Sequence, residues 1–435
     1  MNTKNYLIIL GASFECLGMY HKAKAMGLQI IGIDYNPDSV AFEYADIPIV
    51  ASAKHADQVI DILDKLKLNY IGIVQTALEN SITLQRVAEH YNLISVSAEV
   101  AMNTTDKVLR YRALEGKANI PKFYRVVEKP YESKLKYPYI LKPSMMSGSR
   151  GVCKINNDKD LDEFWEEVDA YNQWISIEEI IHGKEISIEG FVVKGKLYIT
   201  GFNERLYKYT DNRFIELGSM APTTFTNIEV QIIINEFDKA VKALNITDGP
   251  TKGDMILSDG VPYIIEVTSR LAGAFGSKIQ PLNNGTDIET ATLQWILGRE
   301  VDVNLLIPKF NKPVVHLYYL HKAGVVKNIT IPELDVEHVG INYMPKDGDE
   351  LEDLQFINRI LYVITTGDTV ELALERAKRE LDKVVIEYHE CDYNYDDCCS
   401  NCPNLDYVLV PHPGGYDTES VEQYYCKLEY WEEDF

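Results

Sequence analysis

The N-terminal part of the chain alternates between short apolar runs and a segment with helical spacing of its apolar residues. Apolar runs at residues 6–10, 29–33 and 71–74 predict buried strands, and the apolar stripe at 56–66 predicts an amphipathic helix. Strands that alternate with helices form a parallel sheet with helices on both faces. The pattern therefore predicts a Rossmann-like α/β domain over residues 1–103.

The turn after the first strand, residues 11–18, reads GASFECLG and lacks the G-x-G-x-x-G spacing of a dinucleotide site. Asp34, at the end of the second strand, follows too early to be the ribose ligand of such a site. We therefore expect a Rossmann-like shell without a working dinucleotide site.

The middle of the chain, residues 104–300, mixes strand and helix patterns without strict alternation, which is typical of an α+β region. Helical spacing is present at residues 107–117, 161–171 and 230–244. Strand patterns are present at residues 139–141, 152–155, 186–193 and 196–199, and a hairpin pattern at 253–267. We expect a domain of two lobes with a flexible loop at 144–151.

The C-terminal part predicts strands at residues 314–319 and 361–365 and an amphipathic helix at 370–381. These elements predict a third, α+β domain over residues 301–390 that completes the core. Residues 391–435 lose periodicity and form an acidic tail rich in Cys and Tyr. The predicted fold class is thus α/β and α+β multidomain, with an N-terminal parallel sheet.

The net charge of −23 argues against nonspecific binding to nucleic acid or to an anionic membrane surface. The sequence contains neither an apolar stretch of membrane-spanning length nor a signal-peptide pattern. We expect a cytoplasmic protein with reduced thiols and with neither a nucleic-acid nor a membrane partner.

Five of the seven cysteines fall in the predicted tail, where Cys399 and Cys402 form a C-x-x-C pair. Two further ligands for a tetrahedral zinc site are available from a set of four residues nearby: Cys391, Cys426, His389 and His412. The alternative is a set of free thiols in an acidic appendage, because no second C-x-x-C follows.

The hairpin at 253–267 places two carboxylates on adjacent strands, with Asp254 before the turn and Glu266 after it. Side chains at matching depth on one face can share a cation, and Mg²⁺ prefers such oxygen ligands. Mg²⁺ bound in this way completes its ligand shell with water and nucleotide phosphates. Arg270, four residues after Glu266, can reach the same phosphates or a developing oxyanion. The alternative is two exposed acids and a surface arginine.

Two further segments carry polar residues suited to a nucleotide. Lys142 ends a strand and precedes the Ser- and Gly-rich loop at 144–151, whose backbone amides can approach phosphates. An extended apolar segment at 177–187 can present backbone groups to a purine, with Glu185 near the ribose. Read separately, these segments are an ordinary hairpin loop and an amphipathic strand pair.

Together and in this order, the three segments resemble the ATP-grasp superfamily, over roughly residues 5–390 and with the fold order of its biotin-carboxylase-like branch. The resemblance implies an ATP-grasp fold, ATP and Mg²⁺ (or Mn²⁺) as cofactors, and metal ligation by Asp254 and Glu266. It also implies a set of nucleotide-binding residues: Lys107, Lys142, Ser147, Gly148, Ser149, Gly151, Glu178, Glu179, Ile180, Ile181 and Glu185.

The chain departs from the family pattern at Thr268, where many members have an Asn ligand two residues after the second acid. Thr is a poorer metal ligand, so the departure puts the strength of a second metal site in question.

The resemblance implies a ligase that joins a carboxylate and an amine through an acyl phosphate, with Arg270 and Lys142 as catalytic residues. The small residues after Arg270, beginning at Gly273, resemble amino-acid and dipeptide ligases, in which this turn wraps the substrate. Arg205 is then expected to hold a substrate carboxylate and Glu216 an ammonium group, or both are surface charges.

Two other functions remain open at this stage. One is an ATP-grasp carboxylase of the biotin-dependent or purine-pathway type, although the chain has no Met-Lys dipeptide of a biotin carrier. The other is a non-catalytic nucleotide-binding protein that uses the tail as an interaction arm. For a ligase we expect small carboxylate and amine substrates as partners and a homodimer as the assembly.

Overall fold

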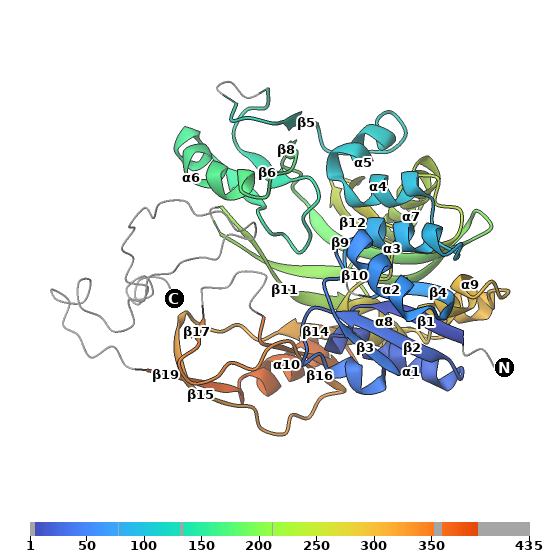
Figure 1. Ribbon diagram of the computed structural model, residues 1–435. Coiled ribbons are helices and arrows are strands. Elements are labelled where there is room, and N and C mark those ends of the chain that lie inside the picture. The colour runs from blue at the N-terminus through green and yellow to red at the C-terminus, as the bar shows by residue number, and fades with distance from the viewer. Residues whose placement is uncertain (1–4, 77, 131–133, 211, 352–358, 390–435) are drawn as a thin grey trace, which may run out of the picture.

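The computed structural model describes residues 5–76, 78–130, 134–210, 212–351 and 359–389. Long strands cross the middle of the molecule, the N-terminal sheet lies below them in the view of Figure 1, and a small sheet lies above them. Two sheets therefore flank a larger one.

The N-terminal sheet is parallel throughout and has the strand order β3-β2-β1-β4, as the alternating pattern predicted. Its strands are β1 (Asn5–Leu10), β2 (Gln29–Asp34), β3 (Ile47–Val50) and β4 (Asn69–Gln75). The helices around it are η1 (Phe14–Cys16), α1 (Leu17–Ala25), η2 (Val40–Tyr44), α2 (Ala56–Leu66) and α3 (Ser81–His90).

Alternate residues of β1 supply two separate hydrophobic cores. Leu7 and Ile9 pack in the cluster that includes α1, whereas Ile8 and Leu10 pack in the cluster that includes α2. Successive side chains of a strand point to opposite faces, so a strand covered on both sides needs the continuous apolar run found here.

The small sheet has the order β5-β8-β6-β7 and is covered by helix α6 (Asp158–Asp169), whose Leu161, Trp165 and Val168 enter its core. Its strands are β5 (Phe123–Val126), β6 (Tyr139–Pro143), β7 (Cys153–Ile155) and β8 (Ile175–Glu179). Helices α4 (Ala98–Thr105) and α5 (Lys107–Leu114) precede it. Helix α5 ends before the predicted boundary at 117, because Gly116 adopts a positive φ of 70° that a helix does not allow.

The large sheet is antiparallel and has the order β13-β12-β9-β10-β11-β14-β18-β16. Its strands are β9 (Lys184–Val193), β10 (Lys196–Tyr209), β11 (Phe214–Ala221), β12 (Gly249–Ser258), β13 (Val261–Thr268), β14 (Val314–Tyr318), β16 (His338–Ile341) and β18 (Leu361–Thr366). Its associated helices are α7 (Asn227–Ala243), α8 (Ala274–Asn283), α9 (Ile288–Ile296) and η3 (Val303–Leu306).

The predicted third region contributes β14, β16 and β18 to the large sheet and forms a further sheet of order β17-β15-β19. The elements of that further sheet and its helix are β15 (Gly324–Thr330), β17 (Glu350–Leu351), β19 (Val385–Tyr388) and α10 (Val370–Leu381). Residues 301–390 thus share a sheet with the middle of the chain, and the exact domain boundaries stay predictions.

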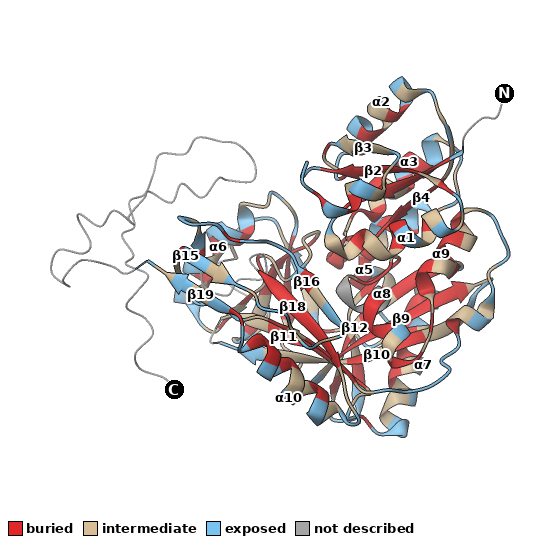
Figure 2. Cartoon of the chain, turned by 90° about the horizontal axis from the view of Figure 1, so that it is seen from below, coloured by how far each residue is buried: buried red, intermediate tan, exposed pale blue. Residues whose placement is uncertain are grey.

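Most residues of the central strands are buried, and exposed residues gather on helices and loops (Figure 2). Strand β10 continues ten residues beyond the predicted end at 199. The prediction stopped short because the second half of the strand carries the polar residues Asn203, Arg205 and Tyr207 towards the interior. Polar residues in a buried strand interrupt the apolar pattern by which strands are predicted.

The tail at 391–435, with the Cys399 and Cys402 pair, lies outside the described residues. His389, the one described member of the proposed zinc set, lies 2.7 Å from the Asp347 carboxylate. Within the described ranges, we find no group of three or more metal-ligating side chains. None of the helices in these ranges is long and apolar enough to cross a membrane.

Candidate active site

The hairpin of β12 and β13 places the two predicted metal ligands directly opposite each other. Asp254 pairs in register with Glu266, and Asp259 and Gly260 turn the chain with positive φ values of 47° and 78°. The side chains of Asp254 and Glu266 are 19% and 21% exposed. The expectation of matching depth on adjacent strands is therefore confirmed.

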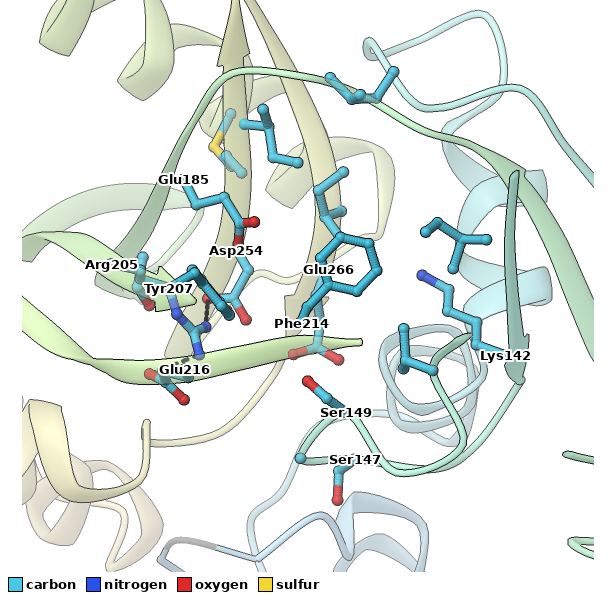
Figure 3. Close-up of a pocket in the computed structure, with 18 of the residues that line it drawn as sticks. Lys142, Ser147, Ser149, Glu185, Arg205, Tyr207, Phe214, Glu216, Asp254 and Glu266 are labelled. Atoms are coloured by element: carbon cyan, nitrogen blue, oxygen red, sulfur yellow. Dashed lines mark ion pairs between the residues drawn. The ribbon is translucent and has the colours of Figure 1, made fainter. Parts of the chain in front are cut away.

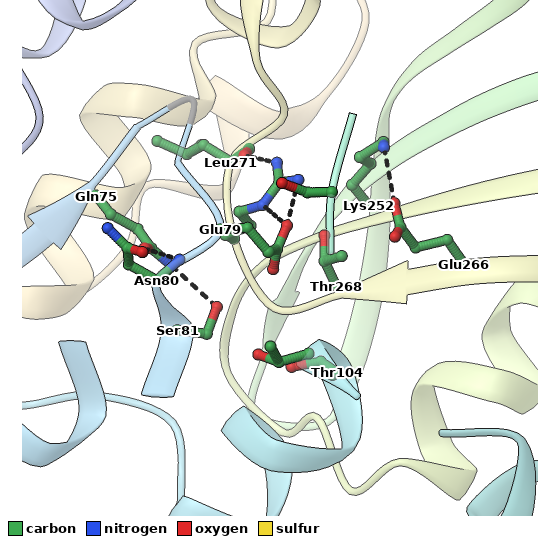
Figure 4. Close-up of polar contacts among 12 residues, drawn as sticks. Gln75, Glu79, Asn80, Ser81, Thr104, Lys252, Glu266, Thr268 and Leu271 are labelled. Atoms are coloured by element: carbon green, nitrogen blue, oxygen red, sulfur yellow. Dashed lines mark hydrogen bonds and ion pairs between the residues drawn. The ribbon is translucent and has the colours of Figure 1, made fainter. Parts of the chain in front are cut away.

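Lys252 lies between these carboxylates and was not anticipated from the sequence. Its Nζ is 2.7 Å from Asp254 Oδ2. The same atom is 3.4 Å from Glu266 Oε2 (Figure 4). Burial opposes ionisation of both acids, but the adjacent cations, Lys252 foremost, hold the pKa of Asp254 below and that of Glu266 well below its usual range. Both acids are consequently ionised and available to a cation. Lys252 shares a strand face with Asp254, two residues away, and this spacing is the sequence signal that could have identified it.

A second unanticipated cation lies close to Glu266. Arg110, on α5, has a fully buried side chain, and its Nη1 is 3.8 Å from Glu266 Oε1. All three of its guanidinium nitrogens lack a hydrogen-bond partner among the described residues. Glu266 is thus the carboxylate that offsets this buried charge.

The donor set suits Mg²⁺. Asp254 and Glu266 supply hard carboxylate oxygens from rigid neighbouring strands. Asp254 Oδ1 is buried and accepts no regular hydrogen bond, although Arg205 Nη1 lies 3.0 Å away. Thr268 differs: it is fully buried, does not line the cavity, and its hydroxyl has no partner among the described residues. Its predicted metal role stays a prediction without support from this geometry.

Lys142 is the residue before the last of β6, and its Nζ lies 2.7 Å from Glu178 Oε2. The same carboxylate accepts hydrogen bonds from the Tyr111 hydroxyl at 3.0 Å and from the Ser176 hydroxyl at 2.8 Å. The Glu178 side chain therefore orients Lys142, and its nucleotide contact stays a prediction.

Lys107 begins α5 and points at the start of the Ser- and Gly-rich loop. Its ammonium group donates to the carbonyl oxygens of Ser144 and Met146. Burial lowers the pKa of Lys107 to about 8, although the carboxylate of Glu266 opposes that shift. Lys107 and Lys142 both line the same cavity.

The loop at 144–151 turns back over the cavity with Ser147, Gly148 and Ser149 in its wall. Gly148 and Ser149 have positive φ values of 66° and 55°, which direct successive backbone amides around a tight turn. Gly151 is not part of the wall. A Cβ at Gly151 would lie 2.8 Å from the Tyr171 ring, so this glycine allows close packing at a positive φ of 68°.

Residues Ile180 to Gly183 connect β8 of the small sheet to β9 of the large sheet and line the cavity. A Cβ at Gly183 would lie 2.1 Å from the Leu257 carbonyl oxygen, so only glycine fits where the connection crosses β12. Glu185 follows, and its Oε1 accepts a hydrogen bond of 3.2 Å from the Tyr209 hydroxyl. The predicted hinge therefore joins the two sheets.

Arg270 follows β13 and is held by an acid from the N-terminal region. Its Nε donates to Glu79 Oε2 at 2.6 Å, and its Nη1 donates to the Leu271 carbonyl at 2.8 Å. The two acceptor residues, Glu79 and Leu271, are labelled in Figure 4. The side chains of Glu79 and Arg270 are only 9% and 11% exposed, and both residues line the cavity. Glu79 was not predicted, since it lies 191 residues from its partner.

Arg205 and Glu216 meet at the other end of the cavity. Arg205 Nη2 lies 2.8 Å from Glu216 Oε1, and its Nη1 reaches Asp254, so that its guanidinium bridges two acids (Figure 3). Arg359, just before β18, approaches the other oxygen of Glu216 at 3.1 Å. Gly273, the N-cap residue of α8, lines the same cavity.

One cavity of about 840 Å³ collects nearly all of these side chains, with Lys142 across from Arg205 and Glu216 (Figure 3). Gly151 and Thr268 are the predicted site residues that do not line it. The predicted residues in its wall are Lys107, Lys142, Ser147, Gly148, Ser149, Glu178, Glu179, Ile180, Ile181, Glu185, Arg205, Glu216, Asp254, Glu266, Arg270 and Gly273.

Asn212 and Arg213, which follow β10 and precede β11, contact the small sheet and its helix α6. Asn212 exchanges hydrogen bonds with the backbone of Lys154, at 2.9 and 2.8 Å, on the small sheet. Arg213 forms an ion pair with Glu167 of α6. The strands that carry Arg205 and Glu216 are therefore tied to the sheet that carries Lys142.

The arrangement has the parts needed to bind a nucleotide and transfer a phosphoryl group. Lysines face the loop that can hold phosphates, a pair of ionised acids is available to Mg²⁺, and a fixed guanidinium stands next to that pair. The Asp34 carboxylate instead accepts hydrogen bonds from the backbone of Ala12 and Asn36 at 2.7 and 3.0 Å. The Asp34 carboxylate thus stabilises the backbone after β1 and after β2.

Comparison with known proteins agrees with this geometry. Residues 104–274 match the family model of the ATP-grasp domain. A D-alanine–D-alanine ligase of Pseudothermotoga lettingae is 30% identical over 172 residues, which are 38% of this chain. The match spans 57% of the length of that ligase.

Two solved structures share the fold along most of the chain. The L-amino acid ligase of Bacillus licheniformis has a TM-score of 0.78 at 19% identity, covering 90% of this chain and 100% of that one. The biotin carboxylase domain of the Hydrogenobacter thermophilus 2-oxoglutarate carboxylase, solved with MgADP, ADP and bicarbonate, has a TM-score of 0.68 at 17% identity, covering 88% and 90%. At these identities the likeness concerns the fold.

The resemblance inferred from the sequence is therefore confirmed by the family match and by the fold. The chain contains an ATP-grasp domain at residues 104–274 and shares the overall fold of the L-amino acid ligase over 90% of its length.

Proposed function

We propose that this protein is an ATP-dependent ligase that joins a carboxylate to an amine, with an amino acid or small peptide among its substrates, and releases ADP and phosphate. The observation that carries the proposal is the register pair Asp254 and Glu266 with Arg270 beside it, facing Lys107 and Lys142 across one cavity. The similarity to a D-alanine–D-alanine ligase and to an L-amino acid ligase supports a carboxylate and an amine as the substrates.

In this proposal Asp254 and Glu266 hold Mg²⁺, which when bound supplies positive charge to the phosphates of ATP. Lys107 and Lys142 neutralise the remaining phosphate charge from the opposite wall. Glu178 keeps the Lys142 ammonium in place through a contact of 2.7 Å. Phosphoryl transfer depends mainly on positioning and charge compensation, and these residues supply both.

The substrate carboxylate attacks the γ-phosphorus of ATP, and the product is an acyl phosphate and ADP. The amine then attacks the acyl carbon, and phosphate leaves from the tetrahedral intermediate. Arg270 faces the negative charge that develops on the acyl oxygen, and its hydrogen bonds to Glu79 and to the Leu271 carbonyl fix its direction. The loop at 144–151 covers the reacting groups and keeps water from hydrolysing the acyl phosphate.

A carboxylase is the second candidate, favoured by the similarity to a biotin carboxylase domain that was solved with bicarbonate. Both reactions form an acyl or carboxy phosphate and ADP, so the same residues serve either one. The distinction lies in the group that ATP phosphorylates, which is the carboxylate of an organic substrate in a ligase and bicarbonate in a carboxylase. The homodimer and the cytoplasmic location stay predictions.

The test is a phosphate-release screen of amino-acid pairs with ATP and Mg²⁺, with bicarbonate as a separate arm. The proposal expects phosphate release that depends on both a carboxylate and an amine and that Glu266→Gln abolishes. Asp238→Asn is the matched control, because Asp238 lies on α7 outside the cavity and pairs with Lys242. Phosphate release that depends on bicarbonate alone would contradict the ligase.

A further inference from the structure

We propose that Asn212 and Arg213, between β10 and β11, form a latch that holds the small sheet against the large sheet when a nucleotide is bound. Release of the nucleotide then requires the latch to open. This inference rests on the nucleotide binding that is part of the proposed function, and it adds a control of nucleotide release. Neither residue lines the cavity, so the latch is distinct from the phosphate and metal contacts.

The small sheet has a hinge side. Its strand order, β5-β8-β6-β7, places β5 and β7 at opposite edges. The chain enters β5 from α5, and the rings of Phe123 on β5 and Tyr111 on α5 lie 5.0 Å apart. The neighbouring strand β8 leads through residues 180–183 into β9 of the large sheet. Both connections to the rest of the chain are therefore made from β5 and β8, on one side of the sheet.

The opposite edge, β7, receives the latch. The backbone N–H of Lys154 donates to the Asn212 carbonyl at 2.9 Å, and Asn212 Nδ2 donates to the Lys154 carbonyl at 2.8 Å. An edge strand leaves backbone groups unpaired on its outer side, and Asn212 pairs with both of those of Lys154. The loop at 144–151 connects β6 to β7. The latch thus holds the side of the small sheet that carries this loop.

Helix α6 supplies a second point of attachment. Arg213 Nη1 lies 3.1 Å from Glu167 Oε1, and Arg213 Nη2 pairs with the other oxygen of that carboxylate. Asp160, in the first turn of α6, accepts a hydrogen bond of 2.8 Å from Asn212 Nδ2. A guanidinium with two bonds to one carboxylate has a defined direction as well as a charge. These contacts join the ends of β10 and β11 to the helix that covers the small sheet (Figure 1).

The attachment is mainly polar, which makes it reversible. Among the described residues, the hydrophobic core cluster of the small sheet and α6 includes none from β10 or β11. The Arg213 guanidinium lies over the Phe164 ring at 4.9 Å. The side chains of Arg213 and Glu167 are 29% and 40% exposed, so water can replace their contacts when they separate. The latch can therefore open and re-form without unfolding either sheet.

The strands that end at the latch also form part of the cavity wall. Tyr207 and Tyr209 of β10 and Phe214 of β11 line the cavity, which Lys142 of the small sheet also lines (Figure 3). The latch fixes the far ends of these strands to the small sheet. It therefore fixes the width of the cavity between the two sheets, and a nucleotide held between them is released more slowly while the latch is closed.

The test measures release of ADP that carries a fluorescent N-methylanthraniloyl group from full-length protein with Mg²⁺, by stopped-flow mixing with excess ADP. Arg213→Met removes the ion pair from the hairpin side, and Glu167→Gln removes its charge from the α6 side. The turn itself is kept in Arg213→Met, because its hydrogen bonds between Thr210 and Arg213 use the backbone of Arg213 and not its side chain.

Arg213→Met should raise the release rate at least about tenfold, because it removes charge-assisted bonds and such losses act mainly on dissociation. Glu167→Gln should raise the rate in the same direction, and the double variant should release no faster than Arg213→Met, because both changes remove one contact. The matched control is Lys129→Met. Lys129 pairs with Asp162 of α6, but this pair joins α6 to the segment after β5 and not to the large sheet. The control should keep the wild-type rate.

An unchanged release rate in both Arg213→Met and Glu167→Gln would overturn the latch, and so would an equal rise in Lys129→Met. Failure of wild-type protein to bind the fluorescent ADP would overturn the latch together with nucleotide binding. ADP formation from ATP with the amino-acid pairs is measured in parallel. Faster release in the variants of a protein that forms no ADP would contradict the ligase and leave the latch standing. ADP formation with unchanged release would overturn the latch alone.

Discussion

The ion pair of Arg270 and Glu79 allows the catalytic role of an arginine to be separated from its structural role. Arg270→Met removes a guanidinium and leaves the Glu79 carboxylate, 9% exposed, without its cation. Glu79→Gln in the same chain removes that leftover charge. The single and double variants therefore differ in the buried charge and agree in lacking the guanidinium.

The size of each effect follows from the contacts. Leaving a buried partner of an ion pair unpaired costs about 3–5 kcal/mol, and Glu79 Oε1 is already buried without a hydrogen-bond partner among the described residues. Loss of a donor that stabilises a developing oxyanion costs about 10²–10³ in rate, equivalent to roughly 3–4 kcal/mol. Arg270→Met should therefore lower both stability and turnover, and the double variant should recover stability without recovering turnover.

The assay combines thermal unfolding of the full chain with ADP formation on the same samples. We expect a clear fall of the melting temperature in Arg270→Met, recovery of most of it in the double variant, and turnover lower by at least about a hundredfold in both. Glu79→Gln alone should slow turnover by about tenfold, because Arg270 keeps its charge and loses a charged support. Recovery of turnover in the double variant would refute a direct role of Arg270.

Glu266→Gln should weaken Mg²⁺-dependent ATP binding and abolish turnover while the fold is kept; near-normal turnover at saturating Mg²⁺ would contradict the metal assignment. Burial raises the pKa of Glu189 from 4.5 to about 7, so folded protein holds that proton between these values while unfolded protein releases it. Stability contributed by Glu189 is therefore present below pH 4.5 and lost by about 3 kcal/mol as pH rises to 7. The melting temperature of wild type relative to Glu189→Gln should fall over this range, and a constant difference would contradict the burial argument. Removal of residues 391–435 should leave Mg²⁺-dependent ATP binding intact in calorimetry, and its loss from folded protein would extend the catalytic core into the tail.

Local sequence patterns were sufficient to predict the strands that carry the two acids and the strands of the N-terminal sheet. The hairpin that carries Asp254 and Glu266 has two apolar runs on either side of a Ser-Asp-Gly turn, so the sequence predicted both the strands and the matching depth of the two acids. The parallel N-terminal sheet followed from continuous apolar runs for the same reason.

Contacts between distant segments could not be predicted. Glu79 reaches Arg270 across 191 residues, and Arg359 reaches Glu216 across 143. The sequence around Glu79 and around Arg359 does not indicate which residue either one contacts, because an isolated charged residue in a polar segment is typical of a protein surface. Only the pairing of β11 with β14, and of β14 with β18, brings Arg359 to the cavity.

The family resemblance assigned some residues to the cavity that they line, but it did not predict which side chains they contact. Glu178 belongs to the predicted hinge, but its side chain turns inward to Lys142 and Tyr111. Lys252 was overlooked because a lysine beside two acids resembles an exposed salt bridge, whereas its side chain is 12% exposed. An exposed salt bridge and a buried lysine differ in the burial of the side chain, and burial is a property of the folded chain.

The central claim is that a substrate carboxylate is phosphorylated by ATP. The measurement that tests it most directly uses a carboxylate substrate labelled with ¹⁸O, together with ATP, Mg²⁺ and the amine, followed by mass spectrometry of the products. The account predicts ADP and one ¹⁸O atom transferred from each carboxylate to inorganic phosphate, because the acyl phosphate breaks between carbon and the labelled oxygen. Formation of AMP that carries the label, with pyrophosphate, would contradict it.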